Sequence, residues 1–154
     1  MKARQELFAA RYENAASLFS KLVTAEPSNG DAWCGLVQAE VAAKHSPDAY
    51  AAAEEALNKA PKSAGAQAAM GLADFRRGDL PKASHEFEAA LKLDPNYPAA
   101  LIGLARVSSA VSLFRTARDL RLRAWRLSPD DPSLAPAYAC TLETKDRIAA
   151  LEAA

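Results

Sequence analysis

Prolines recur at a fixed step along this chain. Counting from Pro95 in steps of 34 residues reaches Pro61 and Pro27 in one direction and Pro129 in the other. With nine prolines in 154 residues, the chance that three preset positions all hold proline is on the order of one in five thousand. The same step connects Ala15, Ala49, Ala83 and Ala117. The chain is therefore a tandem array of 34-residue units.

Each unit reads as two helices, because its apolar residues recur at helical spacing in two groups separated by a short polar break. In the unit 30–63 the break contains Ser46, a good helix N-cap, and Pro47, which suits a first helical turn. In the unit 64–97, Gly78 is expected to take the left-handed conformation that ends a helix, and Asp79 to cap the next one. Proline lacks an N–H and disfavours the α conformation of the residue before it, so each in-register proline ends one helix pair.

The register divides residues 1–154 into a single array. We expect a partial unit at 1–29, units at 30–63, 64–97 and 98–131, and a C-terminal segment at 132–154 that is either a cap or a further partial unit. The turn of the fourth unit has no glycine where one would be expected. Whether the chain is complete or cut from a longer protein stays open at this stage.

Composition favours closely packed helices. Half of the residues are apolar and about a quarter are alanine, whereas glycine is scarce. Nineteen basic and nineteen acidic residues cancel, so no global field attracts nucleic acid or an anionic membrane, and we expect neither as a partner. Cys34 and Cys140 lie three units apart, too far for a disulfide, and two free thiols fit a reducing compartment such as the cytoplasm. No signal peptide or stretch long enough to span a bilayer is recognisable.

The stretch from Met70 to Pro95 places Gly71, Phe87, Ala90 and Pro95 at spacings that resemble the tetratricopeptide repeat family. Departures are Val37, in place of a small glycine, and Ala53 and Arg121, in place of an aromatic residue of the second helix. The resemblance covers essentially the whole chain. It implies an all-α, right-handed superhelix, an α-solenoid in which the first helices line a concave groove. It also implies that a peptide or a helix of a partner protein binds there.

Helical geometry predicts which side chains line this groove on the first helices. We expect apolar residues with scattered arginines, typical of a site for a segment with apolar anchors and a few acids. The alternative is that residues such as Leu72, Phe75 and Ile102 only pack between adjacent first helices. The predicted peptide-binding residues are Gln38, Val41, Leu72, Phe75, Arg76, Ile102 and Arg106. Further residues expected on the same face are Arg4, Phe8, Asp31, Cys34, Ala42, Ala68, Ala99, Ser109, Cys140 and Glu143.

Several other kinds of site are not indicated. Family members that clamp a chaperone's terminal carboxylate use Lys and Asn, and the corresponding positions here hold other residue types. The arginine-rich run from Arg115 to Arg126 carries Asp119 at helical spacing, and a solvated outer face is favoured over a nucleic-acid site. Trp33 and Trp125 fall at packing positions. His45 and His85 show no spacing typical of a metal site, so we expect no metal or other cofactor.

No catalytic triad and no glycine-rich phosphate loop is identifiable, so the sequence predicts that the chain is not an enzyme. The leading interpretation is a non-catalytic protein–protein interaction module that binds a partner's peptide or helix in its groove. The alternatives are a structural segment that forms homo-oligomers by stacking through its end helices, or a recruiting domain of a larger enzyme. The sequence does not identify the partner.

Overall fold

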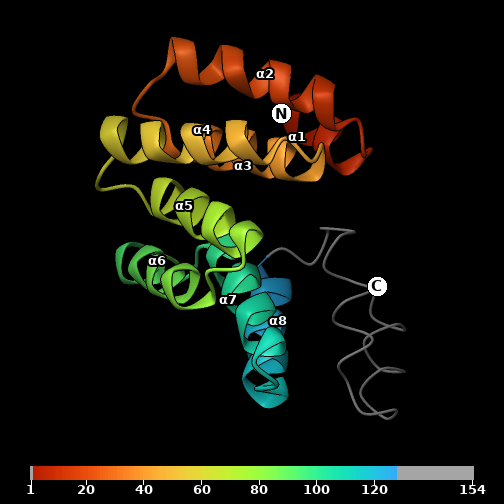
Figure 1. Ribbon diagram of the computed structural model, residues 1–154, viewed down its shortest axis with the longest axis vertical. Coiled ribbons are helices and arrows are strands. Elements are labelled where there is room, and N and C mark those ends of the chain that lie inside the picture. Colours follow the sequence, from red (N-terminus) through yellow and green to blue (C-terminus); the bar gives the residue numbers. More distant parts are fainter. Residues whose placement is uncertain (1, 128–154) are drawn as a thin grey trace.

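The protein is helical throughout the part that the structure describes. The computed structural model describes residues 2–127, which form eight α-helices and no strand. The helices are α1 (Lys2–Phe8), α2 (Tyr12–Ala25), α3 (Gly30–Ala42), α4 (Ser46–Lys59), α5 (Ala64–Arg77), α6 (Leu80–Leu93), α7 (Pro98–Ala110) and α8 (Phe114–Leu127). Figure 1 shows them as pairs stacked along the long axis, with the first unit at one end and α7 and α8 at the other. The predicted all-α solenoid is confirmed.

The helix boundaries keep the 34-residue step. The second helices α2, α4, α6 and α8 begin at Tyr12, Ser46, Leu80 and Phe114, and they end at Ala25, Lys59, Leu93 and Leu127. Three of the prolines that define the period, Pro27, Pro61 and Pro95, lie two residues beyond the ends of α2, α4 and α6. Each of these helices therefore ends just before a residue that cannot continue it.

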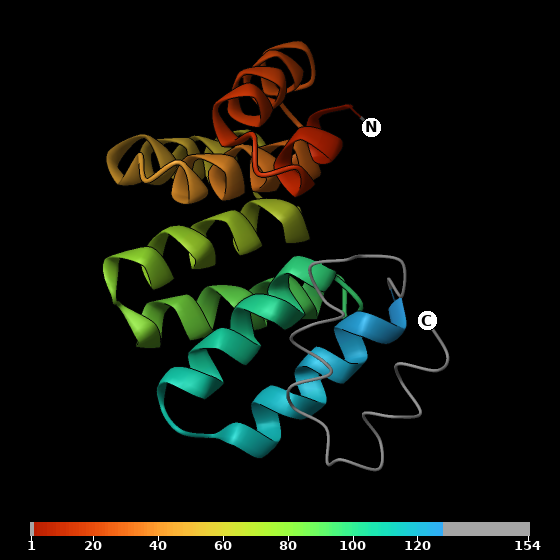
Figure 2. The ribbon, with the colours of Figure 1, turned by 90° about the vertical axis from the view of Figure 1, so that its right-hand side faces the viewer.

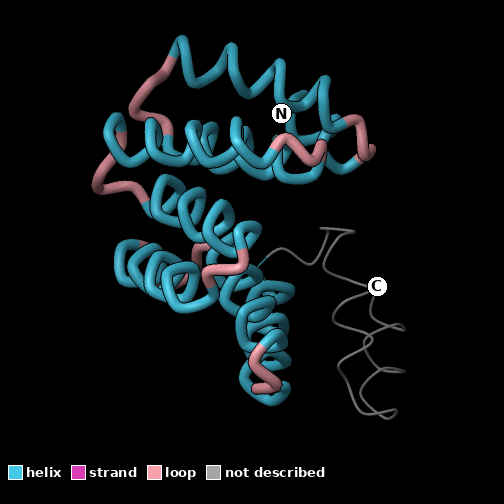
Figure 3. The backbone as a smooth tube through the Cα atoms, viewed as in Figure 1, coloured by secondary structure: helices cyan, strands magenta, loops and turns pink. Residues whose placement is uncertain are grey.

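The turn inside each unit contains one left-handed residue in the same register. These residues are Ala10, Lys44, Gly78 and Ser112, with φ values of 57°, 68°, 83° and 62°. The prediction for Gly78 is confirmed. In the fourth unit, whose turn has no glycine, Ser112 takes this conformation at the cost of backbone strain. Figure 3 shows the connecting turns between the helices.

Side-chain caps explain several helix starts. Asn29 Oδ1 accepts a hydrogen bond from Ala32 N at 3.0 Å, and Ser63 Oγ accepts one from Gly65 N at 3.1 Å. Asp79 Oδ1 accepts one from Lys82 N at 3.3 Å, as expected. The prediction that Ser46 caps α4 is wrong. His45 occupies the N-cap position without a side-chain cap bond, because α4 begins one residue earlier, at Ser46.

The two helices of a unit occupy different layers. First helix packs on first helix, α3 on α5 and α5 on α7, and each second helix also packs on the first helix that follows it. In the described residues no comparable contact joins α2 to α4 or α4 to α6. A stack that is tight on one side and splayed on the other curves toward the tight side, so the first helices form the inner face. Figure 2 shows the stack turned by 90°.

Alanine and a few large side chains fill the core between the layers. Phe87 and Val37 are fully buried. Trp33 is buried as predicted, and its Nε1 donates a hydrogen bond to Pro27 O at 2.8 Å, which secures the loop before α3. Trp125 is half-buried against a smaller cluster in the fourth unit. The four members of that cluster are Leu101, Ala105, Leu120 and Ala124.

Candidate groove on the first helices

The inner face is built from α3, α5 and α7, which lie close enough that some positions exclude a side chain. A Cβ atom added to Gly65, at the start of α5, would lie 2.4 Å from the carbonyl carbon and oxygen of Gly30, at the start of α3. The two backbones therefore nearly touch at their N-terminal ends. This close approach brings the N-terminal ends of α3 and α5 into direct contact.

Six of the seven predicted binding residues retain exposed surface. Val41, Phe75 and Ile102 are half-buried, one on each of the three first helices, and all three pack partly against the core. Gln38 is half-buried, and its Nε2 lies 3.6 Å from Cys34 Sγ. Arg76 and Arg106 are exposed.

Leu72 does not lie on the exposed side of α5. Its side chain is only 7% exposed and belongs to the hydrophobic core, because the helices packed around α5 cover it. The expectation that Leu72 offers exposed surface to a ligand is therefore wrong.

Cys34 and Ala68, also expected on the open face, are buried as well. Burial raises the pKa of the Cys34 thiol to about 12, so the thiol stays protonated at neutral pH and is a packing residue. Cys140 and Glu143 lie outside the described residues.

The charged residues of the inner face are largely uncompensated. Within residues 2–127 no carboxylate forms an ion pair with Arg76 or Arg106. Surrounding protein and the nearby charge of Arg121 lower the pKa of Arg106, although the residue is exposed overall. Arg121 reaches from α8 to α7, where its Nη2 donates a hydrogen bond to Ser109 Oγ at 3.0 Å. Two guanidinium groups that lie close together favour an anionic ligand group.

A hydrogen bond crosses the inner face near the N-terminal ends of the first helices. Tyr97, directly before α7, donates through its hydroxyl to Asp31 Oδ1 on α3 at 2.8 Å. The bond joins the start of the second unit to the last residue of the third, directly before α7. Burial, with the nearby carboxylate of Asp31 adding to it, raises the pKa of Tyr97, so its hydroxyl remains a donor. Sequence reasoning missed this contact, because a separation of 66 residues carries no local signal.

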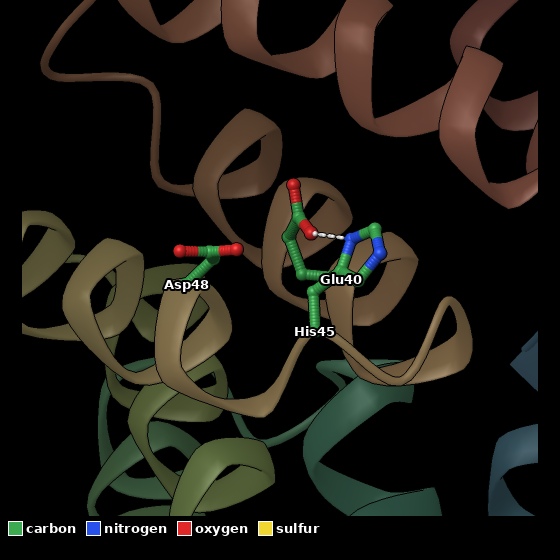
Figure 4. A group of neighbouring side chains, drawn as sticks. All are labelled: Glu40, His45 and Asp48. Atoms are coloured by element: carbon green, nitrogen blue, oxygen red, sulfur yellow. Dashed lines mark hydrogen bonds and ion pairs between the residues drawn. The ribbon is translucent and has the colours of Figure 1, made fainter.

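Glu40, His45 and Asp48 are the strongest candidates for a metal site in the described part of the chain. One potential ligand atom from each lies within 4.8 Å of the others. Figure 4 shows His45 Nδ1 directed at Glu40 Oε2, at 3.0 Å. This hydrogen bond accounts for the pair without a metal, and His45 and Asp48 are exposed. Proximity of this kind is common on protein surfaces, so the prediction that no metal binds stays a prediction.

The arginine-rich helix α8 is paired differently from the expectation. The helical spacing of Asp119 predicts that it pairs with Arg115 and Arg123, each four residues away. Instead, Arg118 Nε lies 3.4 Å from Asp119 Oδ1, and Arg123 Nη2 donates to the carbonyl oxygen of Pro95 at 2.9 Å. Helical spacing considers only residues of the same helix, so it could not predict that Arg123 binds a carbonyl oxygen of the loop before α7.

Two hollows in the described residues lie off the inner face. One, of about 410 Å³, lies between the turns of the first and second units, beside Arg11 and Lys44. The other, of about 470 Å³, lies between α2 and α4 and includes Trp33 and Leu36. The candidate groove is the open inner face of α3, α5 and α7. No described helix is both long and apolar enough to cross a membrane.

Comparison with known proteins identifies the repeat. Two family profiles described as tetratricopeptide repeat match residues 9–73 and 64–107. No curated protein sequence matches the chain. Similar solved structures include a thermophilic tetratricopeptide repeat protein from Thermus thermophilus, with a TM-score of 0.70 and 18% identity over 96% of this chain and 81% of that one.

Two further solved structures are similar in fold. One is a chain of the APC/C hetero-tetramer Cut9–Hcn1, with a TM-score of 0.80 and 16% identity. That match covers 97% of this chain and 28% of the other, so this chain spans a small part of that protein. The other is MamA residues 41 to the end from Desulfovibrio magneticus RS-1, with a TM-score of 0.55 and 20% identity over 84% of this chain and 73% of that one.

Proposed function

Because the chain belongs to the tetratricopeptide repeat family, whose repeats serve as protein-interaction scaffolds, we propose that its inner face binds a peptide or a helix of a partner protein. The module is proposed to be non-catalytic. The observation that carries the proposal is the make-up of this face. One half-buried apolar side chain from each of three successive first helices, Val41, Phe75 and Ile102, lies on the same layer as two exposed arginines, Arg76 and Arg106.

The apolar and arginine side chains of the inner face indicate which kind of partner segment binds there. Half-buried apolar side chains gain contacts when a partner's apolar side chain covers them, and this burial supplies affinity. Arg76 and Arg106 have no carboxylate partner in residues 2–127, so each can donate hydrogen bonds to an acidic side chain of the ligand. Such a contact fixes the orientation of the bound segment. The expected partner is a short segment with apolar anchors and at least one acid. An affinity in the micromolar range corresponds to about −8 kcal/mol.

The experiment starts from peptides selected by display on the purified chain. Their affinities are then measured by fluorescence anisotropy with the double variant R76E/R106E. We expect the selected peptides to contain Asp or Glu. We also expect R76E/R106E to weaken binding about tenfold or more, because two favourable charge contacts become repulsive.

The matched control is K59E/K92E. It makes the same change in net charge at exposed positions of α4 and α6, outside the inner face. This control should bind the peptides as the wild type does. Equal loss in both double variants would show only a long-range effect of charge. Unchanged binding to R76E/R106E would remove these arginines from the site.

A second candidate is a structural role in which copies stack through their end helices. The observation that favours it is that Phe8 and Leu22, on α1 and α2, are exposed in the first unit. Sedimentation velocity distinguishes the two functions. Association that strengthens with concentration and is lost in F8S/L22S supports stacking, whereas a monomer at all concentrations supports the groove alone.

A further inference from the structure

The turn between α7 and α8 differs from the turns of the other units. Its left-handed residue is Ser112, flanked by Val111 and Leu113. The residues that correspond to Leu113 in the first three units are Arg11, His45 and Asp79, all polar. Because three polar residues allow the same left-handed turn, backbone geometry does not require an apolar residue there. The apolar character of this turn therefore calls for another explanation.

The apolar side chains of this turn face solvent. Val111 is 49% exposed, Leu113 is 55% exposed and Phe114, the first residue of α8, is 68% exposed. The residues that correspond to Phe114 in the first and third units, Tyr12 and Leu80, are half-buried. We call Val111, Leu113 and Phe114 the α7–α8 tip. Figures 1 and 3 show that this turn projects at the end of the helical stack farthest from α2.

The backbone of the tip is held in place by hydrogen bonds. Leu113 N donates to Ser108 O at 2.8 Å, and Ser112 N donates to Ser109 O at 3.1 Å. Ala117 N then donates to Leu113 O at 3.0 Å, which begins α8. The exposed side chains are thus presented from an ordered turn, which lowers the entropic cost of burying them against a partner.

The charge of the fourth unit provides the second observation. Residues 98–131 contain six arginines and three aspartates, a net charge of +3, although the whole chain is neutral. Arg115 is exposed directly after Phe114, and Arg118 follows one turn later on α8. The expectation that no membrane binds was based on the neutral total, which averages out this local excess.

We propose that the α7–α8 tip docks the protein on an anionic lipid surface. Leu113, Phe114 and Val111 enter the boundary between headgroups and acyl chains, and Arg115 and Arg118 lie at the level of the lipid phosphates. A protruding turn fits a deformable lipid interface, whereas a protein partner would have to supply a matching pocket. Insertion by one short turn gives reversible attachment, and the inner face of α3, α5 and α7 stays free to bind its partner.

The test measures co-sedimentation of the chain with vesicles. Phosphatidylcholine vesicles are compared with vesicles that also contain about 30% phosphatidylserine. We expect binding to the anionic vesicles to be about tenfold stronger and to fall as salt rises, because each arginine near the surface adds attraction that salt screens.

Variants locate the contact. L113S/F114S should reduce binding to anionic vesicles at least about fivefold, and R115E/R118E should reduce it at least about tenfold. Serine is favourable directly before a helix, so the change at Leu113 does not threaten α8. The matched controls are L93S, which changes an exposed leucine on α6, and K59E/K92E. Both controls should bind as the wild type does.

Two results would overturn the proposal. The first is the absence of binding to anionic vesicles at millimolar lipid by folded wild-type protein. The second is equal binding by the wild type and L113S/F114S, with circular dichroism showing that both are folded. If the tip variant lost an acidic protein ligand while the wild type bound no vesicles, the tip would be a protein-docking surface instead.

Discussion

The second and third units fill the same interior space in opposite ways. In the third unit, Phe87 is fully buried, and a Cβ atom added to Gly71 or Gly103 would lie 2.8 Å or 2.3 Å from its ring. One period earlier, the position of Phe87 holds Ala53, and the two glycine positions hold Val37 and Ala69. These three residues are also fully buried. A large side chain between two glycines has been replaced by a small one between larger neighbours.

This comparison explains why the departures from the family pattern at Val37 and Ala53 do not disturb the fold. Protein interiors are packed densely, and volume-conserving exchanges are tolerated better than single changes in size. The register indicates that Val37 and Ala69 occupy the space that a phenylalanine at position 53 would fill. Each unit therefore conserves packed volume and not a particular residue.

The largest expected effect comes from truncating the one large side chain of this set. Phe87→Ala should lower the free energy of unfolding by about 3–5 kcal/mol, because it leaves a cavity between Gly71 and Gly103 that backbone cannot fill. Urea denaturation measures this loss. A loss below about 1 kcal/mol would contradict the packing described for the third unit.

A triple variant tests the comparison itself. Gly71→Val, Phe87→Ala and Gly103→Ala together give the space around position 87 the residues found one period earlier, Val37, Ala53 and Ala69. We expect the triple variant to recover about 1–2 kcal/mol of the stability lost in Phe87→Ala, because the added side chains reduce the cavity. Gly103→Ala alone, with Phe87 in place, should destabilise by about 1–3 kcal/mol. A triple variant less stable than Phe87→Ala would show that larger side chains at positions 71 and 103 cannot fill the space that Phe87 leaves.

The turns of the same two units should respond in opposite directions. Lys44 has φ 68° in the second unit, and Gly78 has φ 83° in the third. Lys44→Gly should raise the free energy of unfolding by about 0.5–1 kcal/mol, because relief of strain exceeds the entropy that glycine loses. Gly78→Ala should lower it by about 1 kcal/mol. Thermal denaturation of both variants checks the pair, and two changes of the same sign would contradict it.

The smallest effect concerns a buried acid of the third unit and its counterpart in the second. Asp74 is buried, and burial raises its pKa above the ordinary value of 3.8. Ionised Asp74 therefore disfavours the folded state at neutral pH. This penalty disappears as the pH falls through the raised pKa and below 3.8. We expect Asp74→Asn to raise Tm by about 1–3 °C at pH 7, and the gain to vanish below about pH 4.

The control for this prediction is the residue one period earlier, Glu40, whose carboxylate is hydrogen-bonded to His45. Glu40→Gln should give no gain at pH 7, because it weakens that bond. A gain for Asp74→Asn that persisted unchanged at about pH 3 would show that the cause is packing and not ionisation.

The structural features that recur in every unit were predictable from the sequence, because the same residue pattern marks each of them several times along the chain. The proline register predicts the helix pairs, and the glycine at position 78 predicts a left-handed residue there. The same conformation at Ala10, Lys44 and Ser112 was not predictable from residue type, since these residues disfavour it. The same pair of backbone hydrogen bonds accompanies it in each turn, as from Lys44 N to Val41 O and from His45 N to Glu40 O.

The candidate site was predictable only in outline. Helical spacing gave the face that carries Val41, Phe75 and Ile102, but it could not show that neighbouring helices cover Leu72. The cluster of Glu40, His45 and Asp48 was also missed, because a turn and two helix ends bring it together. A count of charge within each unit, in place of the chain total, would have shown the +3 of residues 98–131 from the sequence alone.

The hydrogen bond from Tyr97 to Asp31 connects the first helices of the array at their N-terminal ends only. It ties the leading ends of α3 and α7, where Gly65 also brings α5 against Gly30. The trailing ends of the same helices have no such tie among the described residues. If a segment binds the inner face as proposed, we expect it to separate the trailing ends of α3 and α7 more readily than the leading ends, which this hydrogen bond holds together.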